Sequence, residues 1–248
     1  MISRNKTWLV LLAVVLALGG IGWLGHLRSA KGTEPIGLFT SLAILWSDSP
    51  DLGADLRGDQ APHWARGVLA QRGPIVPLDS LTGQPGHGPL DGLTRLVIAQ
   101  PRPLSPAENV ALDNWVRGGG HLLLLADPAL TEDSAFAIGD PRRPQAVALL
   151  SPILGRWGLD LLFDDAQELG EAQREVLGAE LPVNLAGHFA THGQANCRLW
   201  AGGLAVTCKI GQGRVVAVAD AAVLERDDPA GTRPGALNAL LDSAFAPG

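Results

Sequence analysis

Two short apolar runs separated by a well-capped helix dominate the pattern of hydrophobic and polar positions. Residues 96–99 and 122–126 are apolar without polar alternation, which is typical of strands covered on both faces of a parallel sheet. Between them, Ser105, Pro106 and Glu108 form a capping-box sequence, which predicts that a helix begins at Ser105. These elements predict a β-α-β unit, whose crossover connection requires parallel strands.

Further apolar runs extend this unit into a larger sheet. Residues 35–40, 75–78 and 214–219 have the length and composition of strands, and residues 234–245 have the apolar spacing of a helix. The order of the elements predicts an α/β fold of the flavodoxin-like type. We expect a mostly parallel sheet with strand order 2-1-3-4 and helices on both faces, plus a β-hairpin.

The first thirty residues have a different character. Residues 8–24 are 17 uncharged residues that follow Arg4 and Lys6, and as a helix they would span about 25 Å, near the lower limit for crossing a bilayer. The only candidate signal-peptide cleavage site, at residues 28–30, is poor. We therefore expect an uncleaved transmembrane anchor at residues 1–30 and a single α/β domain at residues 31–248. This organisation predicts a single-pass protein of the inner (cytoplasmic) membrane.

The two cysteines of the chain bear on the location of the domain. A two-residue turn at Gly202 and Gly203 would place Cys197 opposite Cys208 as a hydrogen-bonded pair with α-carbons about 5.5 Å apart, a spacing that a disulfide accepts. A disulfide would favour an oxidising compartment, so we expect the domain to be periplasmic or otherwise outside the cytoplasm. Two reduced, buried cysteines are the alternative.

Charge excludes one class of partner. The formal net charge is -6, and Lys and Arg form no block anywhere in the sequence. A surface for nucleic acid needs a concentrated positive charge, so the sequence predicts no nucleic-acid partner.

Polar residues follow the predicted strands where ligands bind in open parallel sheets, beyond the carboxyl ends of the strands. The candidates for a binding rim are Thr40, Ser41, Gln100, Asp127 and Asp220, with Asp79 at the end of another strand. Such residues also cap the turns and helices that follow strands, so a structural role stays open for each of them.

The sequence offers no clear motif for a nucleophile, a phosphate cradle or a metal. It contains neither G-x-S-x-G nor G-x-C-x-G, it lacks a Walker A sequence, and the glycines at 118–120 follow a predicted helix instead of preceding one. His188 and His192 have no C-x-x-C pair to complete a zinc site. Arg142 and Arg143 are a possible anion-binding pair, although loop arginines are more often simply solvated. We predict no catalytic residue, no cofactor and no metal.

Four segments carry a resemblance to a known family: residues 36–46, 96–128, 150–165 and 210–225. In this order they resemble the GldG-like family, the ABC-type uncharacterised transport system proteins related to gliding-motility components. The resemblance implies a core similar to a class I glutamine amidotransferase-like domain. It also implies that the amidotransferase nucleophile is absent, because Asp127 stands at that position. The implied partners are the membrane and an ABC permease or ATPase, or another envelope protein.

These inferences lead to one functional prediction and two alternatives. The chain is expected to be a membrane-anchored, non-catalytic accessory or binding component of an ABC-type transport system. One alternative is an envelope hydrolase or amidotransferase-like enzyme that uses the strand-end carboxylates Asp127 and Asp220. The other is a purely structural envelope protein.

Overall fold

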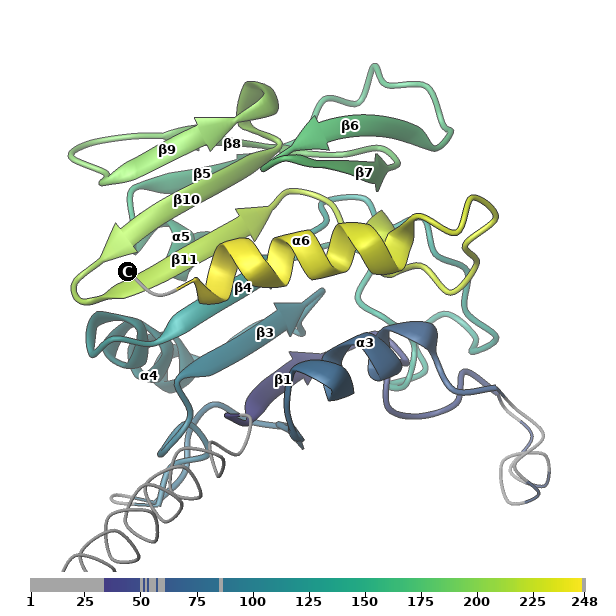
Figure 1. Cartoon of the computed structure of the whole chain (residues 1–248), viewed down its shortest axis with the longest axis horizontal. Coiled ribbons are helices and arrows are strands. Elements are labelled where there is room, and N and C mark those ends of the chain that lie inside the picture. The colour runs from purple at the N-terminus through teal and green to yellow at the C-terminus, as the bar shows by residue number, and fades with distance from the viewer. Residues whose placement is uncertain are drawn as a thin grey trace, which may run out of the picture. The chain divides into compact units, whose positions relative to one another are not determined.

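A computed structural model describes residues 34–49, 51, 53, 57, 61–84 and 87–246 of the chain. Residues 35–248 form one compact unit. Its centre is a sheet of seven strands (Figure 1). In spatial order they are β2 (Ile75–Pro77), β1 (Ile36–Thr40), β3 (Arg95–Ala99), β4 (His121–Leu125), β11 (Gly213–Val218), β10 (Ala205–Ile210) and β9 (Cys197–Trp200).

The β-α-β unit at the centre of the sheet is confirmed. β3 and β4 pair in parallel from Arg95 opposite His121 to Ala99 opposite Leu125. The helix between them, α4 (Pro106–Arg117), begins as predicted: the Ser105 hydroxyl accepts the Glu108 amide at 3.2 Å, and Glu108 accepts the Ser105 amide at 2.9 Å. This reciprocal cap satisfies two amides that a helix start leaves without intrahelical partners.

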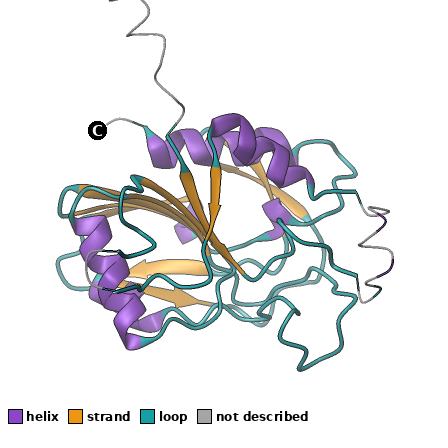
Figure 2. Ribbon diagram, turned by 90° about the horizontal axis from the view of Figure 1, so that it is seen from below, coloured by secondary structure: helices purple, strands orange, loops and turns teal. Residues whose placement is uncertain are grey.

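Helices cover both faces of the sheet (Figure 2). α3 (Trp64–Arg72) and α6 (Arg233–Phe245) pack on one face, while α4 and α5 (Ser151–Arg156) pack on the other. Successive residues of the central strands enter opposite cores: Val97 and Leu123 face α3 and α6, whereas Leu96 and Leu122 face α4 and α5. Burial on both faces explains why these strands are continuously apolar.

The predicted fold class is contradicted for the chain as a whole. The sheet is mixed, because β10 runs antiparallel to both β11 and β9. Only two residues link β10 to β11, too few for a crossover connection. Two separate antiparallel pairs add to it: β5 (Leu159–Leu162) with β8 (His188–Thr191), and β6 (Ala172–Val176) with β7 (Ala179–Val183). The short helices η1 (Ala201–Gly203) and η2 (Ala222–Leu224) complete the described elements.

The expected membrane anchor is also corrected. No helix in the described part of the chain is both long and apolar enough to cross a bilayer. The longest described helix, α6, has 13 residues and therefore spans about 20 Å, against a hydrocarbon thickness of about 30 Å. The predicted span at residues 1–30 lies outside the described residues. The described residues give no support to the predictions of a transmembrane helix and of a single-pass protein of the inner membrane, and both predictions are withdrawn.

A disulfide joins β9 to β10. Cys197 and Cys208 are directly opposite, with an S–S distance of 1.97 Å and α-carbons 4.1 Å apart. The expected hydrogen-bonded pair at about 5.5 Å is wrong: Lys209 donates its amide to Asn196 at 3.0 Å, so the neighbouring cysteines form the closer, non-hydrogen-bonded pair. The turn is η1 instead of a plain two-residue loop.

Candidate functional site

The strand order changes direction at β1, since the chain passes from β1 to β2 on one side and then to β3 on the other. Loops that follow these strands separate at such a switch point and commonly leave a crevice for a ligand. A pocket of about 540 Å³ lies here, which we call the switch-point pocket. Its lining includes the aromatic residues Phe39, Trp46 and Phe136, the hydroxyl residues Thr40, Ser41, Ser47 and Ser49, and the polar residues Asp79, Arg102, Arg142 and Gln145.

The positive charge of Arg102 is already compensated within the protein. Its guanidinium pairs with Glu108 at 2.7 Å and lies 5.0 Å from the centre of the Phe39 ring. The hydrogen bond from Arg102 holds the pKa of Glu108 well below its usual range, so this pair is charged on both sides. Glu108 thus has two roles, because the same carboxylate caps α4.

The second arginine of the pocket is arranged in the same way. Arg142 pairs with Asp140 at 2.8 Å, and its guanidinium lies 4.1 Å from the centre of the Phe136 ring. With both guanidinium groups paired to carboxylates, the pocket presents little net positive charge to a ligand.

Most hydroxyl groups at the end of β1 serve the protein itself. Thr40 Oγ1 accepts the Leu42 amide at 2.9 Å. Ser41 Oγ donates to the carbonyl of Gln100 and accepts the Gln145 amide at 2.9 Å. Ser47 Oγ differs, because it is buried and has no hydrogen-bond partner among the described residues. A buried hydroxyl without a hydrogen bond carries an energetic cost.

Gln100 ties the ends of two strands together. It follows β3 with a positive φ of 42° and is fully buried. Its side chain accepts the Asp127 amide at 2.9 Å and donates to the carbonyls of Asp127 at 3.1 Å and Gln145 at 2.7 Å. All the polar groups of this side chain are therefore used within the fold.

Asp127 and Asp220 follow the neighbouring strands β4 and β11 and are buried. Asp127 accepts the amides of Ala129 at 2.8 Å and Ala221 at 3.2 Å. Asp220 likewise accepts the amides of Ala222 and Asn184. Burial raises the pKa of Asp127 to about 6, and burial together with the charge of Asp127 raises the pKa of Asp220 well above its usual range.

The five predicted rim residues have different positions. Thr40 and Ser41 line the switch-point pocket, whereas Gln100, Asp127 and Asp220 are buried and hold backbone segments together. The structure links three of the five directly across the strand ends, since Ser41 bonds Gln100 and Gln100 bonds Asp127. Asp127 also accepts the amide of Ala221, the residue after Asp220.

Several lining residues were not predicted from the sequence, because they come from irregular loops. Trp46 and Ser47 lie after β1, and Phe136 lies between β4 and α5. A signal existed for Phe136, which is an isolated aromatic residue in an otherwise polar stretch. Among the described residues, no group of three or more His, Cys, Asp or Glu side chains is placed to hold a metal ion.

Comparison with known proteins gives no family. No family model matches the chain, and no curated protein sequence matches it. Several solved structures are similar at low identity. An exo-β-1,4-mannosidase from Opitutaceae bacterium strain TAV5 has a TM-score of 0.47 and 15% identity, over 91% of this chain and 38% of that one. A β-galactosidase from Rahnella sp. R3 has a TM-score of 0.43 and 14% identity, over 87% and 32%. A cytoplasmic protein from Salmonella typhimurium LT2 has a TM-score of 0.45 and 12% identity, over 85% and 99%.

The glycosidases among these structures contradict the prediction that the chain is not an enzyme, and that prediction is withdrawn. They assign no reaction to this chain, because the TM-scores of the mannosidase and the β-galactosidase are only 0.47 and 0.43. The chain also spans only about a third of the length of the mannosidase and the β-galactosidase.

Proposed function

We propose that this domain is a binding component of an ABC-type transport system of the GldG-like kind, and that its switch-point pocket holds a small, uncharged, hydroxyl-rich ligand. The observation that carries the proposal is the pocket itself. It lies where the strand order reverses, and its volume of about 540 Å³ is within the range of small-molecule sites.

The lining supports the choice of ligand class. Trp46 is 43% exposed and offers an aromatic face, on which the apolar side of a ligand can pack. Four hydroxyl residues, Thr40, Ser41, Ser47 and Ser49, also line the pocket and make its wall polar without adding charge. Because the arginines are already paired with Glu108 and Asp140, an anion would gain little from them, whereas a neutral ligand would leave both ion pairs intact.

Support for the transport role comes from the sequence resemblance to the GldG-like family over residues 96–128, 150–165 and 210–225. The partner in this proposal is the permease or the ATPase of an ABC-type system. Two of the three segments contain strands of the central sheet, namely β3 and β4 in the first and β11 in the last.

The alternative of a hydrolase that uses Asp127 and Asp220 is less well supported. Each of the four carboxylate oxygens accepts a backbone amide, and the two residues are buried to 0% and 1% exposure. A general acid or base must come within hydrogen-bond reach of its substrate. These carboxylates would require the surrounding segments to open first.

The transport role is tested by isolating the tagged full-length chain from its native cells after mild chemical cross-linking. We expect an ABC ATPase, recognised by its Walker A sequence, or its permease to be recovered, and the tagged ATPase to recover this chain in return. An untagged strain is the control. Recovery of neither subunit, or recovery that is not reciprocal, would contradict the proposal.

A further inference from the structure

A second pocket lies at the opposite end of the parallel strands, where β4 and β11 begin. It has a volume of about 390 Å³. Four of its lining residues, His121, Arg198, Lys209 and Arg214, are basic, and none of its described lining residues is acidic. We call it the basic pocket. Several of its lining residues lie on β10 and β11, which join in a turn at the end of the sheet where α6 ends (Figure 1).

The strand register projects these basic side chains from one face. Lys209 on β10 is opposite Arg214 on β11, which is opposite His121 on β4. Arg198 on β9 is opposite Thr207, two residues from Lys209 on β10. Directly paired residues and residues two apart along a strand share a face. The four positive or protonatable groups therefore lie on adjacent strands of the same surface.

Three of these cations lack a carboxylate partner in the described part of the chain. No ion pair among the described residues involves Arg198, Lys209 or Arg214. The Nε atom of Arg214 is also buried, and no described residue offers it a hydrogen-bond partner. This concentration of positive charge stands out in a chain whose net charge is -6. The mutual repulsion of these cations would be relieved by a bound anion.

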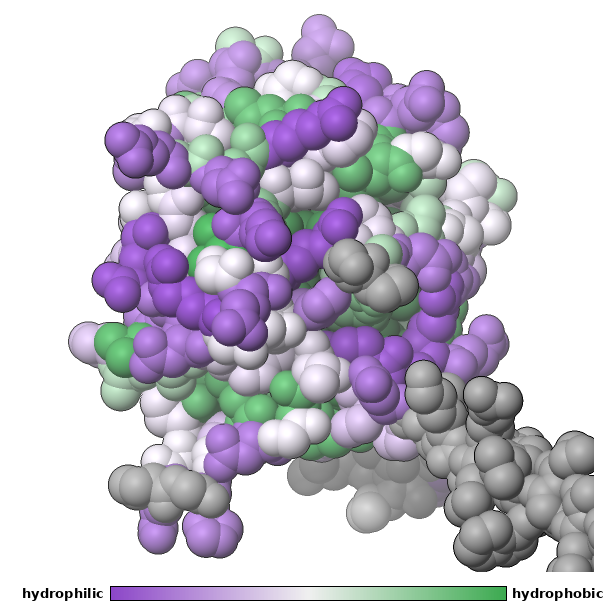
Figure 3. Space-filling view, turned by 60° about the vertical axis from the view of Figure 1, so that its left-hand side comes forward, coloured by the Kyte–Doolittle hydropathy of each residue, from purple (hydrophilic) through white to green (hydrophobic). Residues whose placement is uncertain are grey.

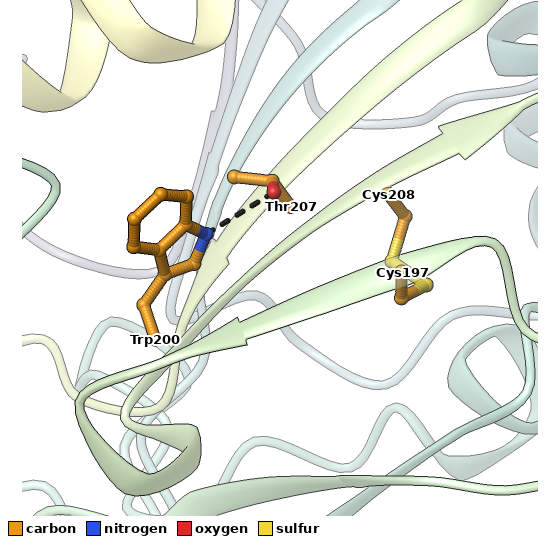
Figure 4. Close-up of a disulfide and its surroundings, with 4 residues drawn as sticks. All are labelled: Cys197, Trp200, Thr207 and Cys208. Carbon is orange, nitrogen blue, oxygen red and sulfur yellow. Dashed lines mark hydrogen bonds between the residues drawn. A yellow bond between two sulfur atoms is a disulfide. The ribbon is translucent and has the colours of Figure 1, made fainter.

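The arginine on β9 is held in place by its neighbours. Its guanidinium lies 4.0 Å from the centre of the Trp200 ring. The Trp200 indole in turn donates to Thr207 Oγ1 at 3.2 Å, and the disulfide ties β9 to β10 further along the hairpin (Figure 4). A cation restrained in this way loses less side-chain entropy when it binds a ligand.

The end of α6 explains only part of this charge. His121 Nδ1 contacts the carbonyl oxygen of Ala244 in the last turn of α6 at 3.2 Å, where a helix favours positive charge. A carbonyl can only accept, so Nδ1 carries the proton. Among the described residues, Arg198 stacks on Trp200, and neither Arg198 nor Lys209 makes a side-chain hydrogen bond or ion pair, so both charges are left without a compensating group.

We propose that the basic pocket binds the phosphate group of a small phosphorylated molecule through Arg198, Lys209 and Arg214. Guanidinium groups match the oxygen geometry of phosphate, and three cations suit a dianion better than a single carboxylate. The volume fits a small molecule. Figure 3 brings this side of the molecule forward, and much of the surface in that view is hydrophilic. The site lies at the other edge of the sheet from the switch-point pocket and does not depend on it.

The proposal is tested by isothermal titration calorimetry of the full-length chain with inorganic pyrophosphate. We expect saturable binding at one site. Arg198→Ala and Lys209→Ala should each weaken it about tenfold or more, which is about 1.4 kcal/mol. Arg66→Ala is the matched control, because Arg66 is an exposed arginine on α3 outside the pocket. This control should change affinity by less than about twofold.

Four results would overturn the proposal. The first is the absence of pyrophosphate binding. The second is an equal loss of affinity in Arg66→Ala, which would indicate diffuse attraction, and the third is binding of citrate as tight as that of pyrophosphate. Lys209 is exposed, so Lys209→Ala should fold normally, and circular dichroism checks this. Retained affinity in a folded Lys209→Ala chain would also contradict the proposal.

Discussion

Asp127 and Asp220 occupy an environment that favours their neutral forms. Both side chains are buried just beyond the ends of two adjacent strands, β4 and β11, and burial is the main cause of their raised pKa values. The amides that bond them oppose this effect without cancelling it. Burial also raises the pKa of Glu132 to about 7. These three carboxyl groups make the stability of the fold sensitive to pH in a range where most carboxylates have already ionised.

The first prediction concerns the pH dependence of stability. Because the pKa of Asp127 is raised to about 6, the folded state binds more protons than the unfolded state between about pH 4 and pH 6. The free energy of unfolding should therefore fall as the pH rises through this window, by about 3 kcal/mol for this group. The lowered pKa of Glu108 has the opposite effect. Its contribution to the free energy of unfolding is lost as the pH falls below about 4.5.

Urea unfolding at several pH values checks this expectation. Asp127→Asn should flatten the decline between about pH 4 and pH 6, because the group that titrates in this window is removed. Asp165→Asn, at an exposed position, is the control and should leave the curve unchanged. If the curves of the wild type and Asp127→Asn ran parallel, the raised pKa of Asp127 would be refuted.

The positions of single residues at the strand ends could be predicted from the sequence, but whether each is exposed or buried could not. The ends of apolar runs identify Thr40, Gln100 and Asp127 as strand-end residues. Whether such a residue lines a pocket depends on segments far away in the chain. Gln100 is covered partly by the backbone at Gln145, and Asp220 bonds the amide of Asn184. No local pattern encodes these contacts.

Among the elements, those with local signals were predictable and those set by tertiary pairing were not. The capping box at Ser105 and the two apolar runs around it define α4, β3 and β4 without other information. By contrast, β6 alternates little and contains Arg174 and Glu175. Its pairing with β7 depends on a short turn at Leu177 and Gly178, both with positive φ.

The close approach of β11 to the end of α4 gives a second prediction. A Cβ atom at Gly213 would overlap the carbonyl oxygens of Val116 and Gly120. Backbone cannot yield as a flexible side chain does, so Gly213→Ala should destabilise the fold by about 3 kcal/mol. Gly67→Ala is the matched control, because Gly67 is exposed on α3 with no atom within 4 Å of the added methyl.

The control should stabilise the fold by roughly 0.5 to 1 kcal/mol, as expected for alanine in a helix. Urea unfolding measures both variants. A Gly213→Ala chain as stable as the wild type would show that β11 and α4 do not approach each other this closely.

The hairpin of β9 and β10 gives a third prediction. The Cys197–Cys208 disulfide closes a loop with a sequence separation of 11 residues, so its reduction should lower the free energy of unfolding by about 2 to 3 kcal/mol. Unfolding with and without a thiol reductant checks this, and the Cys197→Ser, Cys208→Ser double variant should match the reduced protein. An unchanged unfolding midpoint after reduction would contradict the expectation.

Among the pockets in the described part of the molecule, two of different charge lie at opposite ends of the strands of one sheet. At the carboxyl edge, Arg102 and Arg142 are paired with carboxylates, and the Ser47 hydroxyl has no partner among the described residues. At the amino edge, Arg198 and Lys209 have no carboxylate partner in the described part of the chain. The chemistry therefore assigns a neutral ligand to one edge and an anionic ligand to the other.

The most direct test of the central claim observes the switch-point pocket through Trp46. Trp46 lines the pocket, whereas the Trp115 and Trp157 indoles donate hydrogen bonds to Leu93 and Asp113 elsewhere. The full-length chain, labelled with ¹⁵N, is titrated with methyl α-glucopyranoside as a neutral, hydroxyl-rich probe. Trp46→Phe assigns the Trp46 indole resonance, and Phe163→Ala is the control because Phe163 is similarly exposed, at 41%, outside the pocket.

The account predicts that the Trp46 indole resonance shifts in a saturable way while those of Trp115 and Trp157 stay in place, with the same titration curve in Phe163→Ala. A Trp46 resonance that does not move, or shifts of similar size at all three indoles, would contradict the binding function proposed for this pocket.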